Sequence, residues 1–151
     1  MSQKAYGIDE LKTLTGKQLG FSEWMVVDQA RVDQFADATD DHQWIHVDPA
    51  RAKDGPFGGT IAHGYLTLSL APHLLQQIWS VEGARLGVNY GCNKVRFPSP
   101  VPVGSEMRLA VTVAEAEEVE GGVQVALDIV FEVRDAKKPA CVAQVVYRYF
   151  R

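Results

Sequence analysis

The sequence predicts an α+β fold in which an antiparallel β-sheet wraps around a long central α-helix. From about residue 63 to 81, apolar side chains occupy nearly every side of a helical wheel, and a helix of that kind is surrounded by protein. From Arg85 onward the apolar residues instead alternate with a period of two, as in strands joined by hairpins. A curved sheet folded around one helix satisfies both patterns.

Length and composition favour one domain over residues 1–151. A chain of 151 residues can bury about 68–70% of its unfolded surface in a single core. Its 46% hydrophobic and 23% charged residues are ordinary for a globular protein. The 15 Lys and Arg against 19 Asp and Glu leave a net charge of −4, so no basic surplus favours nucleic acid as a partner.

Hydropathy and cysteine content predict a cytoplasmic protein without a membrane span. Residues 1–12 lack the hydrophobic core of a secretory signal. Residues 65–75, the longest apolar-leaning stretch, fall short of the roughly 18 residues that a membrane span needs. Cys92 and Cys141 match no metal or redox spacing and are too few for a disulfide framework, so we expect reduced, buried thiols.

Capping signals define the helices that precede the central one. Asp28 is a favourable N-cap for a helix that ends near Thr39. Asp48 followed by Pro49 predicts a cap and a first-turn proline. The elements expected before the central helix are a short helix at 9–15, a strand at 21–27, a helix at 28–39, irregular chain at 40–47, a helical turn at 48–55 and a loop at 54–59.

Turn signals and periodicity divide the rest of the chain. Pro72 removes a backbone donor and is expected to kink or restart the central helix. The apolar alternation slips in phase near Asn93, which predicts a bulge or bend. The expected strands are 86–97, 107–113, 123–133 and 141–149, with hairpin turns at Gly121-Gly122 and around Lys138-Pro139.

A polar loop directly before the buried helix brings acid and base groups together. Asp41 and His46 are spaced so that both side chains can reach one volume, where such a pair can hold a water and remove its proton. Caps and turns explain the same residue types, and Asp48 is expected to be a cap. His42 and His46 have the spacing of two zinc ligands on a helix, but the sequence offers no H-E-x-x-H glutamate and no obvious third ligand. A metal site is therefore the weaker interpretation.

A second candidate group lies at the start of the central helix, in Ala62-His63-Gly64. The first turn of a helix carries unpaired N–H groups that can bind a developing negative charge on oxygen. Gly64 has no side chain, so a ligand can approach its backbone closely. A tight packing point between loop and helix would explain the same glycine, and His63 could equally hydrogen-bond its own loop.

Together these motifs resemble the MaoC-like family of (R)-specific enoyl-CoA hydratases. The ordered string is Asp41-x4-His46-x-Asp48-Pro49, then Ala62-His63-Gly64, then the buried helix, then Phe97-Pro98-Ser99-Pro100-Val101-x-x-Gly104. An ordered string of this kind arises by accident far less often than a lone short motif. The resemblance spans residues 35–109 and implies a single hotdog fold, an acyl-CoA thioester as substrate, and a homodimer formed by joining sheets edge to edge.

The resemblance also implies a mechanism without metal or redox cofactor. Asp41, as principal base, and His46, as its partner, would hold one water and add it to a trans-2-enoyl thioester, giving (3R)-3-hydroxyacyl-CoA, or catalyse the reverse dehydration. The backbone N–H of Gly64 would stabilise the enolate oxygen. Burial of Asp41 beside Trp44 and Ile45 is expected to raise the pKa of its carboxyl group so that it acts as a base near neutral pH.

The neighbouring residues are expected to bind substrate. Gln43 stands where the family often has Asn, and Trp44 stands where it often has Pro. Gln43 and His63 are therefore candidate substrate contacts, and Trp44 either lines the acyl pocket or belongs to the core.

The phase-slipped strand offers a small basic patch for the phosphates of coenzyme A. Its candidate residues are Asn93, Lys94 and Arg96. Charged residues that protect a sheet edge from aggregation would give the same pattern.

Two other functions fit the same fold. A hotdog thioesterase would hydrolyse the thioester and release free CoA thiol, whereas a hydratase releases none. A non-catalytic subunit that binds an acyl ligand or a partner would need neither Asp41 nor His46. The acyl chain length and the choice between CoA and acyl-carrier-protein thioesters stay open.

Overall fold

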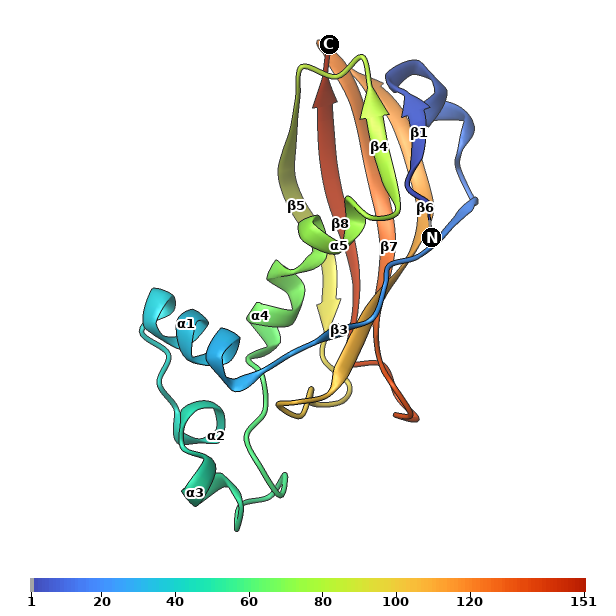
Figure 1. Cartoon of the computed structure of the whole chain (residues 1–151). Helices are drawn as coiled ribbons and strands as arrows, with labels where there is room; N and C mark the ends of the chain where they lie inside the picture. Colours follow the sequence, from blue (N-terminus) through green and yellow to red (C-terminus); the bar gives the residue numbers. More distant parts are fainter. Residues whose placement is uncertain (1) are drawn as a thin grey trace.

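The computed structural model describes residues 2–151, and its main feature is a six-stranded antiparallel sheet with two short helices packed on one face (Figure 1). The sheet runs in the order β2 (Gln18–Phe21), β6 (Glu106–Val119), β7 (Gly122–Val133), β8 (Cys141–Phe150) and β5 (Leu86–Arg96), with β3 (Met25–Val26) beside β6. Two further strands, β1 (Lys4–Gly7) and β4 (Trp79–Glu82), form a small parallel pair. This arrangement confirms the α+β hotdog fold.

The strands alternate in burial as their sequences predict. On β6 the inward residues Met107, Leu109, Val111 and Val113 are buried, while the residues between them are partly exposed. Successive side chains of a strand point to opposite faces, so one face of the sheet covers the core and the other meets solvent. Phe131 of β7 is fully buried in this core.

The central helix is shorter than predicted and is broken in two. Helix α4 covers Gly64–Ser69 and α5 covers Ala71–Leu75, with Pro72 in the first turn of α5. Pro72 lacks the N–H that would bond the preceding turn, so the predicted restart is confirmed. The predicted extent to about residue 81 is wrong, because the chain from Trp79 pairs with β1 as strand β4. Tyr65 is 72% exposed, so the helix is not covered on every side.

Three helices and a 3-10 turn complete the chain. They are η1 (Ile8–Thr13), α1 (Gln29–Thr39), α2 (Trp44–Val47) and α3 (Pro49–Ala52). The Asp28 carboxylate accepts from the N–H of Arg31 at 2.9 Å, and Asp48 accepts from the N–H of Arg51 at 3.1 Å, which confirms both predicted caps. Residues 44–47 were expected to be irregular but form one helical turn, and the strand expected at 21–27 is split between β2 and β3.

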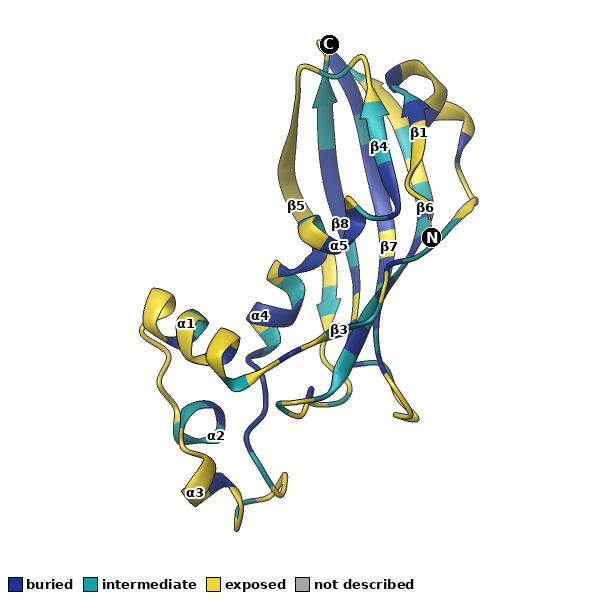
Figure 2. Ribbon diagram, viewed as in Figure 1, coloured by how far each residue is buried: buried dark blue, intermediate teal, exposed yellow. Residues whose placement is uncertain are grey.

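Strand β5 differs from the other long strands because both of its faces are largely open to solvent (Figure 2). Its pairing with β8 shifts register between Asn89 and Gly91 and again between Cys92 and Lys94, so the predicted bulge is confirmed. Cys92 is exposed on this strand, which corrects the expectation of two buried thiols, whereas Cys141 is buried. Both cysteines are free. No helix within residues 2–151 combines the length and the apolar content needed to cross a membrane.

Candidate active site

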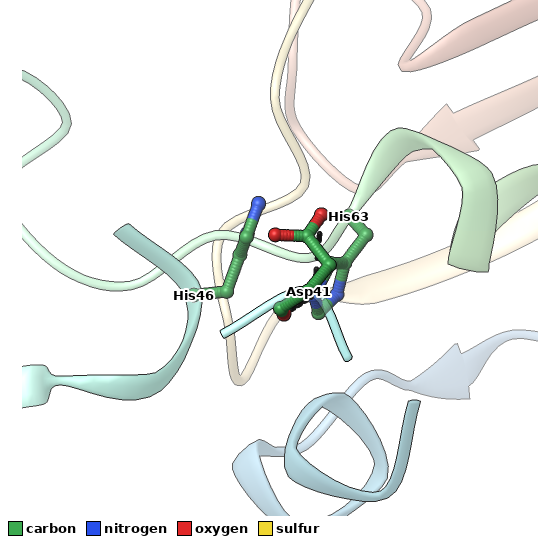
Figure 3. A group of neighbouring side chains, drawn as sticks. All are labelled: Asp41, His46 and His63. Carbon is green, nitrogen blue, oxygen red and sulfur yellow. Dashed lines mark hydrogen bonds and ion pairs between the residues drawn. The ribbon is translucent and has the colours of Figure 1, made fainter. Parts of the chain in front are cut away.

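Three acid and base side chains meet beyond the N-terminal end of α4, where α1, α2 and α3 lie away from the main sheet (Figure 1). Asp41 lies between α1 and α2, His46 lies in α2, and His63 immediately precedes α4. Each offers one oxygen or nitrogen, and these three atoms lie within 4.8 Å of one another (Figure 3). The predicted pairing of Asp41 with His46 is thus present, with His63 as a third member.

The turn after α1 directs Asp41 toward this cluster. Asp40 adopts φ 59°, a left-handed conformation that ends the helix and reverses the chain. The main-chain oxygen of Asp41 accepts a hydrogen bond from Nε2 of His63 at 3.0 Å. Its side chain is 52% exposed, so Asp41 is not buried beside Trp44 and Ile45 as expected. The reason is that this loop lies at the surface, outside the packed core.

His46 is buried and has one nitrogen free for chemistry. Its Nδ1 donates to the main-chain oxygen of Ile61 at 2.7 Å, which leaves Nε2 as the acceptor of the neutral ring. Burial is the main cause that lowers the pKa of His46 below its usual 6.5, and the nearby His63 lowers it further, against the opposing effects of the Ile61 bond and Asp41. At neutral pH the ring is therefore an uncharged acceptor.

His63 is packed directly against His46. The two imidazole rings stack with centroids 3.9 Å apart and an angle of 23° between their planes. Phe35 of α1 also contacts the His63 ring, at 4.9 Å between centroids. His63 is 3% exposed, and its Nδ1 is buried without a hydrogen-bond partner among the described residues.

A cavity of about 360 Å³ adjoins this cluster. Its walls include His46, Gly64, Thr67, Phe57 and Phe97. As the first residue of α4, Gly64 has an N–H with no acceptor one turn earlier in the helix. A β-carbon built on Gly64 would lie 3.2 Å from three atoms of the Phe97 ring. The space beside this glycine is thus filled by Phe97.

The other residues singled out around the loop lie in different settings. The main-chain oxygen of Gln43 accepts from the N–H of His46 at 3.0 Å, which starts the α2 turn. Trp44 packs beside Gly55 and under the Arg51 guanidinium, 4.3 Å from its ring centroid, and it is not among the cavity walls.

The basic patch on β5 stays a prediction. Asn93 donates to the Gln144 side chain at 2.7 Å, and the Arg96 guanidinium donates to the main-chain oxygen of Val95 at 2.7 Å. Lys94 is exposed. Arg96 directly precedes Phe97, so it is the member of the patch that lies next to a cavity wall in the chain.

A shared metal ion does not suit these donors, although their spacing alone would allow one. Ligand nitrogens must aim their lone pairs, which lie in the ring planes, at a common point. The rings of His46 and His63 are stacked nearly parallel, so their lone pairs do not converge. His42, the other partner of the possible zinc pair, is exposed and bonds Asp37 at 2.8 Å, which raises the pKa of its imidazole.

Sequence reasoning missed two partners of the cluster. Phe35 was not among the residues expected at the site, and Ile61 contributes a main-chain carbonyl, which carries no sequence signal. Both contacts join segments that are distant along the chain, so no local pattern marks them.

Comparison with known proteins gives a consistent result. A family model described as a MaoC like domain matches residues 10–133. The chain is 50% identical over 143 residues to 3-hydroxyacyl-thioester dehydratase Z of Mycobacterium tuberculosis, covering 94% of this chain and 95% of that protein.

Two solved structures are similar in fold. The (R)-hydratase from A. caviae involved in PHA biosynthesis aligns with a TM-score of 0.72 and 27% identity, over 88% of this chain and 94% of that one. The monoamine oxidase regulatory protein from Archaeoglobus fulgius aligns with a TM-score of 0.80 and 21% identity, over 100% and 98% of the two chains.

Proposed function

Because this chain belongs to the MaoC-like family, we propose that it is an (R)-specific enoyl-CoA hydratase, which adds water to trans-2-enoyl-CoA to give (3R)-3-hydroxyacyl-CoA or catalyses the reverse dehydration. The chain is a dehydratase of the MaoC type and hence a hydro-lyase. The proposal concerns its substrate and its stereochemistry. The similarity to the (R)-hydratase from A. caviae supports it.

One observation carries the proposal: a carboxylate oxygen of Asp41 and a ring nitrogen of His46 lie within 4.8 Å of each other, and His46 and Gly64 both line the adjoining cavity. A water that donates two hydrogen bonds of about 2.8 Å reaches acceptors roughly 4.5 Å apart. A water held between Asp41 and His46 would bond the carboxylate and Nε2, because Nδ1 of His46 already donates to Ile61. The lowered pKa of His46 keeps its ring neutral, so Nε2 accepts rather than donates.

The reaction follows from this placement. As the water oxygen bonds to C3 of the enoyl thioester, Asp41 takes a proton from the water, and the π electrons of the C2–C3 bond shift toward the thioester oxygen. The N–H of Gly64 stabilises the enolate that forms. The enolate then takes the proton from Asp41 at C2, from the same side, which restores the carboxylate and completes the 3-hydroxyacyl thioester.

The coenzyme would be recognised along strand β5. Lys94 and Arg96 on the exposed strand β5 would contact its phosphates. Asn93 would first have to exchange its bond with Gln144. Gln43 stays a candidate substrate contact, whereas His63 is buried and is not among the cavity walls, so we no longer assign it a contact with substrate. The substrate is an acyl-CoA thioester, and the active form is a homodimer.

The purified protein should consume a short trans-2-enoyl-CoA, measured as loss of the absorbance of the conjugated double bond, and chiral analysis should identify the (3R) product. Asp41→Asn and His46→Gln should each lower kcat by about 10²- to 10⁴-fold, the usual contribution of general acid–base groups. His42→Gln is the matched control, because this exposed neighbour bonds Asp37 and should leave kcat unchanged.

Other outcomes would contradict the proposal. Release of free CoA thiol would identify a thioesterase. Acyl-CoA binding without turnover would identify a non-catalytic subunit. Hydration that survives both substitutions would contradict the assigned mechanism.

A further inference from the structure

His63 contacts both members of the Asp41–His46 pair. We propose that His63 is a positioning residue, which holds the main chain of Asp41 through Nε2 and the ring of His46 through stacking. The inference rests on the proposed function. It assigns His63 no contact with substrate.

The hydrogen bond fixes the first member of the pair. The 3.0 Å contact from Nε2 of His63 to the main-chain oxygen of Asp41 places the ring proton on Nε2, because a carbonyl can only accept. The same nitrogen lies 4.0 Å from a carboxylate oxygen of Asp41. Asp41 lies in an exposed loop, and this bond ties that loop to the buried start of α4. Without it, the carboxylate would be placed less firmly, because its other hydrogen bond, from the N–H of Gln43 to Oδ1, is 3.4 Å long and lies within the same loop.

The stack fixes the second member. The imidazole of His46 can rotate about its side-chain bonds. Two contacts restrict this rotation: the hydrogen bond from Nδ1 to Ile61, and the stacked ring of His63, whose centroid lies 3.9 Å from that of His46. Phe35 packs against His63 in turn, so the supporting ring is itself held by α1. The arrangement aims the free Nε2 of His46 without occupying it.

The stack also disfavours a charge on His46. The titratable groups that act on its imidazole are Asp41, which favours the cation, and His63, which opposes it. A proton on His46 would lie next to a second imidazole in a site that burial already makes unfavourable for charge. His63 thereby helps to keep Nε2 available as an acceptor near neutral pH.

Three variants separate the two contacts. His63→Phe keeps an aromatic ring for the stack but removes the donor. His63→Gln places an amide donor near the position of Nε2 but removes the ring. His63→Ala removes both. His73→Gln on the exposed face of α5 is the matched control for replacing a histidine.

Kinetics with a trans-2-enoyl-CoA should show graded losses. We expect kcat to fall by about ten- to a hundredfold in His63→Ala and by less in His63→Phe and in His63→Gln, with KM nearly unchanged, because no substrate contact is lost. The control variant should match the original protein. The folded fraction, measured by circular dichroism, is used to correct each kcat.

The pKa of His46 is a second measurement, and it would stay unchanged if His63 only supported the fold. Imidazole C–H resonances are followed by NMR against pH, with His46 assigned by the loss of its signal in His46→Gln. We expect the pKa of His46 to rise by up to about one unit in His63→Phe and His63→Gln. The acid limb of the kcat profile should move the same way.

The outcomes distinguish this inference from the proposed function. If the original protein does not hydrate enoyl-CoA, the proposed function fails, but the NMR titration still tests whether His63 controls His46. The inference is overturned if His63→Phe retains the original kcat and pH profile. It is also overturned if kcat falls only in proportion to the folded fraction while the pKa of His46 stays unchanged.

Discussion

At the scale of single residues, contacts between distant segments decide what each candidate residue does. Gly64 was predicted to leave room for a ligand at the helix start, yet the space beside it is filled by the ring of Phe97. Tyr65 packs edge-on against the same ring, with centroids 6.1 Å apart. The close packing of Phe97 therefore favours glycine at position 64, whether or not a thioester also approaches the N–H of Gly64.

Gly64→Ala should lower kcat by about tenfold, because its β-carbon would meet the Phe97 ring at 3.2 Å and displace a wall of the cavity. The double variant Gly64→Ala/Phe97→Leu should recover part of this loss, since the smaller side chain makes room. Gly59→Ala is the control, because a β-carbon there meets nothing within 4 Å. Steady-state kinetics test this. No recovery in the double variant would mean that the substrate, rather than Phe97, needs the space.

His46 should make the stability of the protein depend on pH. Its pKa is lowered in the folded state, mainly by burial, so below about pH 6.5 the unfolded chain binds more protons than the folded one. Above about pH 6.5, His46 should leave the free energy of unfolding undiminished. As the pH drops from there toward the folded-state pKa of His46, the free energy of unfolding should fall with a slope of up to about 1.4 kcal/mol per pH unit. Urea unfolding at several pH values measures it.

His46→Gln should flatten this dependence, whereas His73→Gln should not, because His73 is exposed. An equal slope in the His46 variant and the original protein would assign the effect to another group.

At the scale of elements, short-range signals predicted helix starts well and helix lengths poorly. The caps at Asp28 and Asp48 were found because one side chain and the adjacent backbone form each of them. Helix α2 was missed because its four residues are too few to show a period. Strand β4 was assigned to a helix because a short apolar run fits either structure until a pairing partner, here β1, is known.

Loss of the Asp48 cap should destabilise α3, the helix that directly follows the one carrying His46. Asp48→Ala removes the acceptor for the N–H of Arg51 and should lower the free energy of unfolding by about 1 kcal/mol. Asp48→Asn keeps an oxygen at this position and should cost much less. Chemical unfolding of both variants measures the difference. Equal losses in the two variants would show that the charge, not the cap, is responsible.

At the scale of the whole molecule, the β5 edge of the main sheet exposes apolar side chains that no segment within residues 2–151 covers. Strand β5 pairs with β8 on one side only and exposes Leu86, Val88 and Tyr90. An edge strand with exposed apolar side chains tends to pair with another chain. This surface suits the homodimer that we propose.

The protein should therefore have twice the mass of its 16.6 kDa chain in solution. The double substitution Leu86→Lys/Val88→Lys should shift it toward a monomer, because it places like charges where the two edges would meet. Val26→Lys, at an exposed position on β3, is the control. Sedimentation equilibrium measures the mass. A double variant that remains dimeric would place the interface elsewhere.

The sequence by itself determined the features that depend on near neighbours: the alternating strands, both aspartate caps, the bulge in β5 and the closeness of Asp41 and His46 along the chain. Hydrogen bonds and side-chain periodicity act over a few residues, so they can be recognised in a linear pattern. Only the tertiary structure decided that the chain after α5 continues as strand β4, that Phe97 fills the space beside Gly64, and that His63 stacks on His46. These contacts join residues distant along the chain, and close packing of the whole molecule, rather than local preference, brings them together.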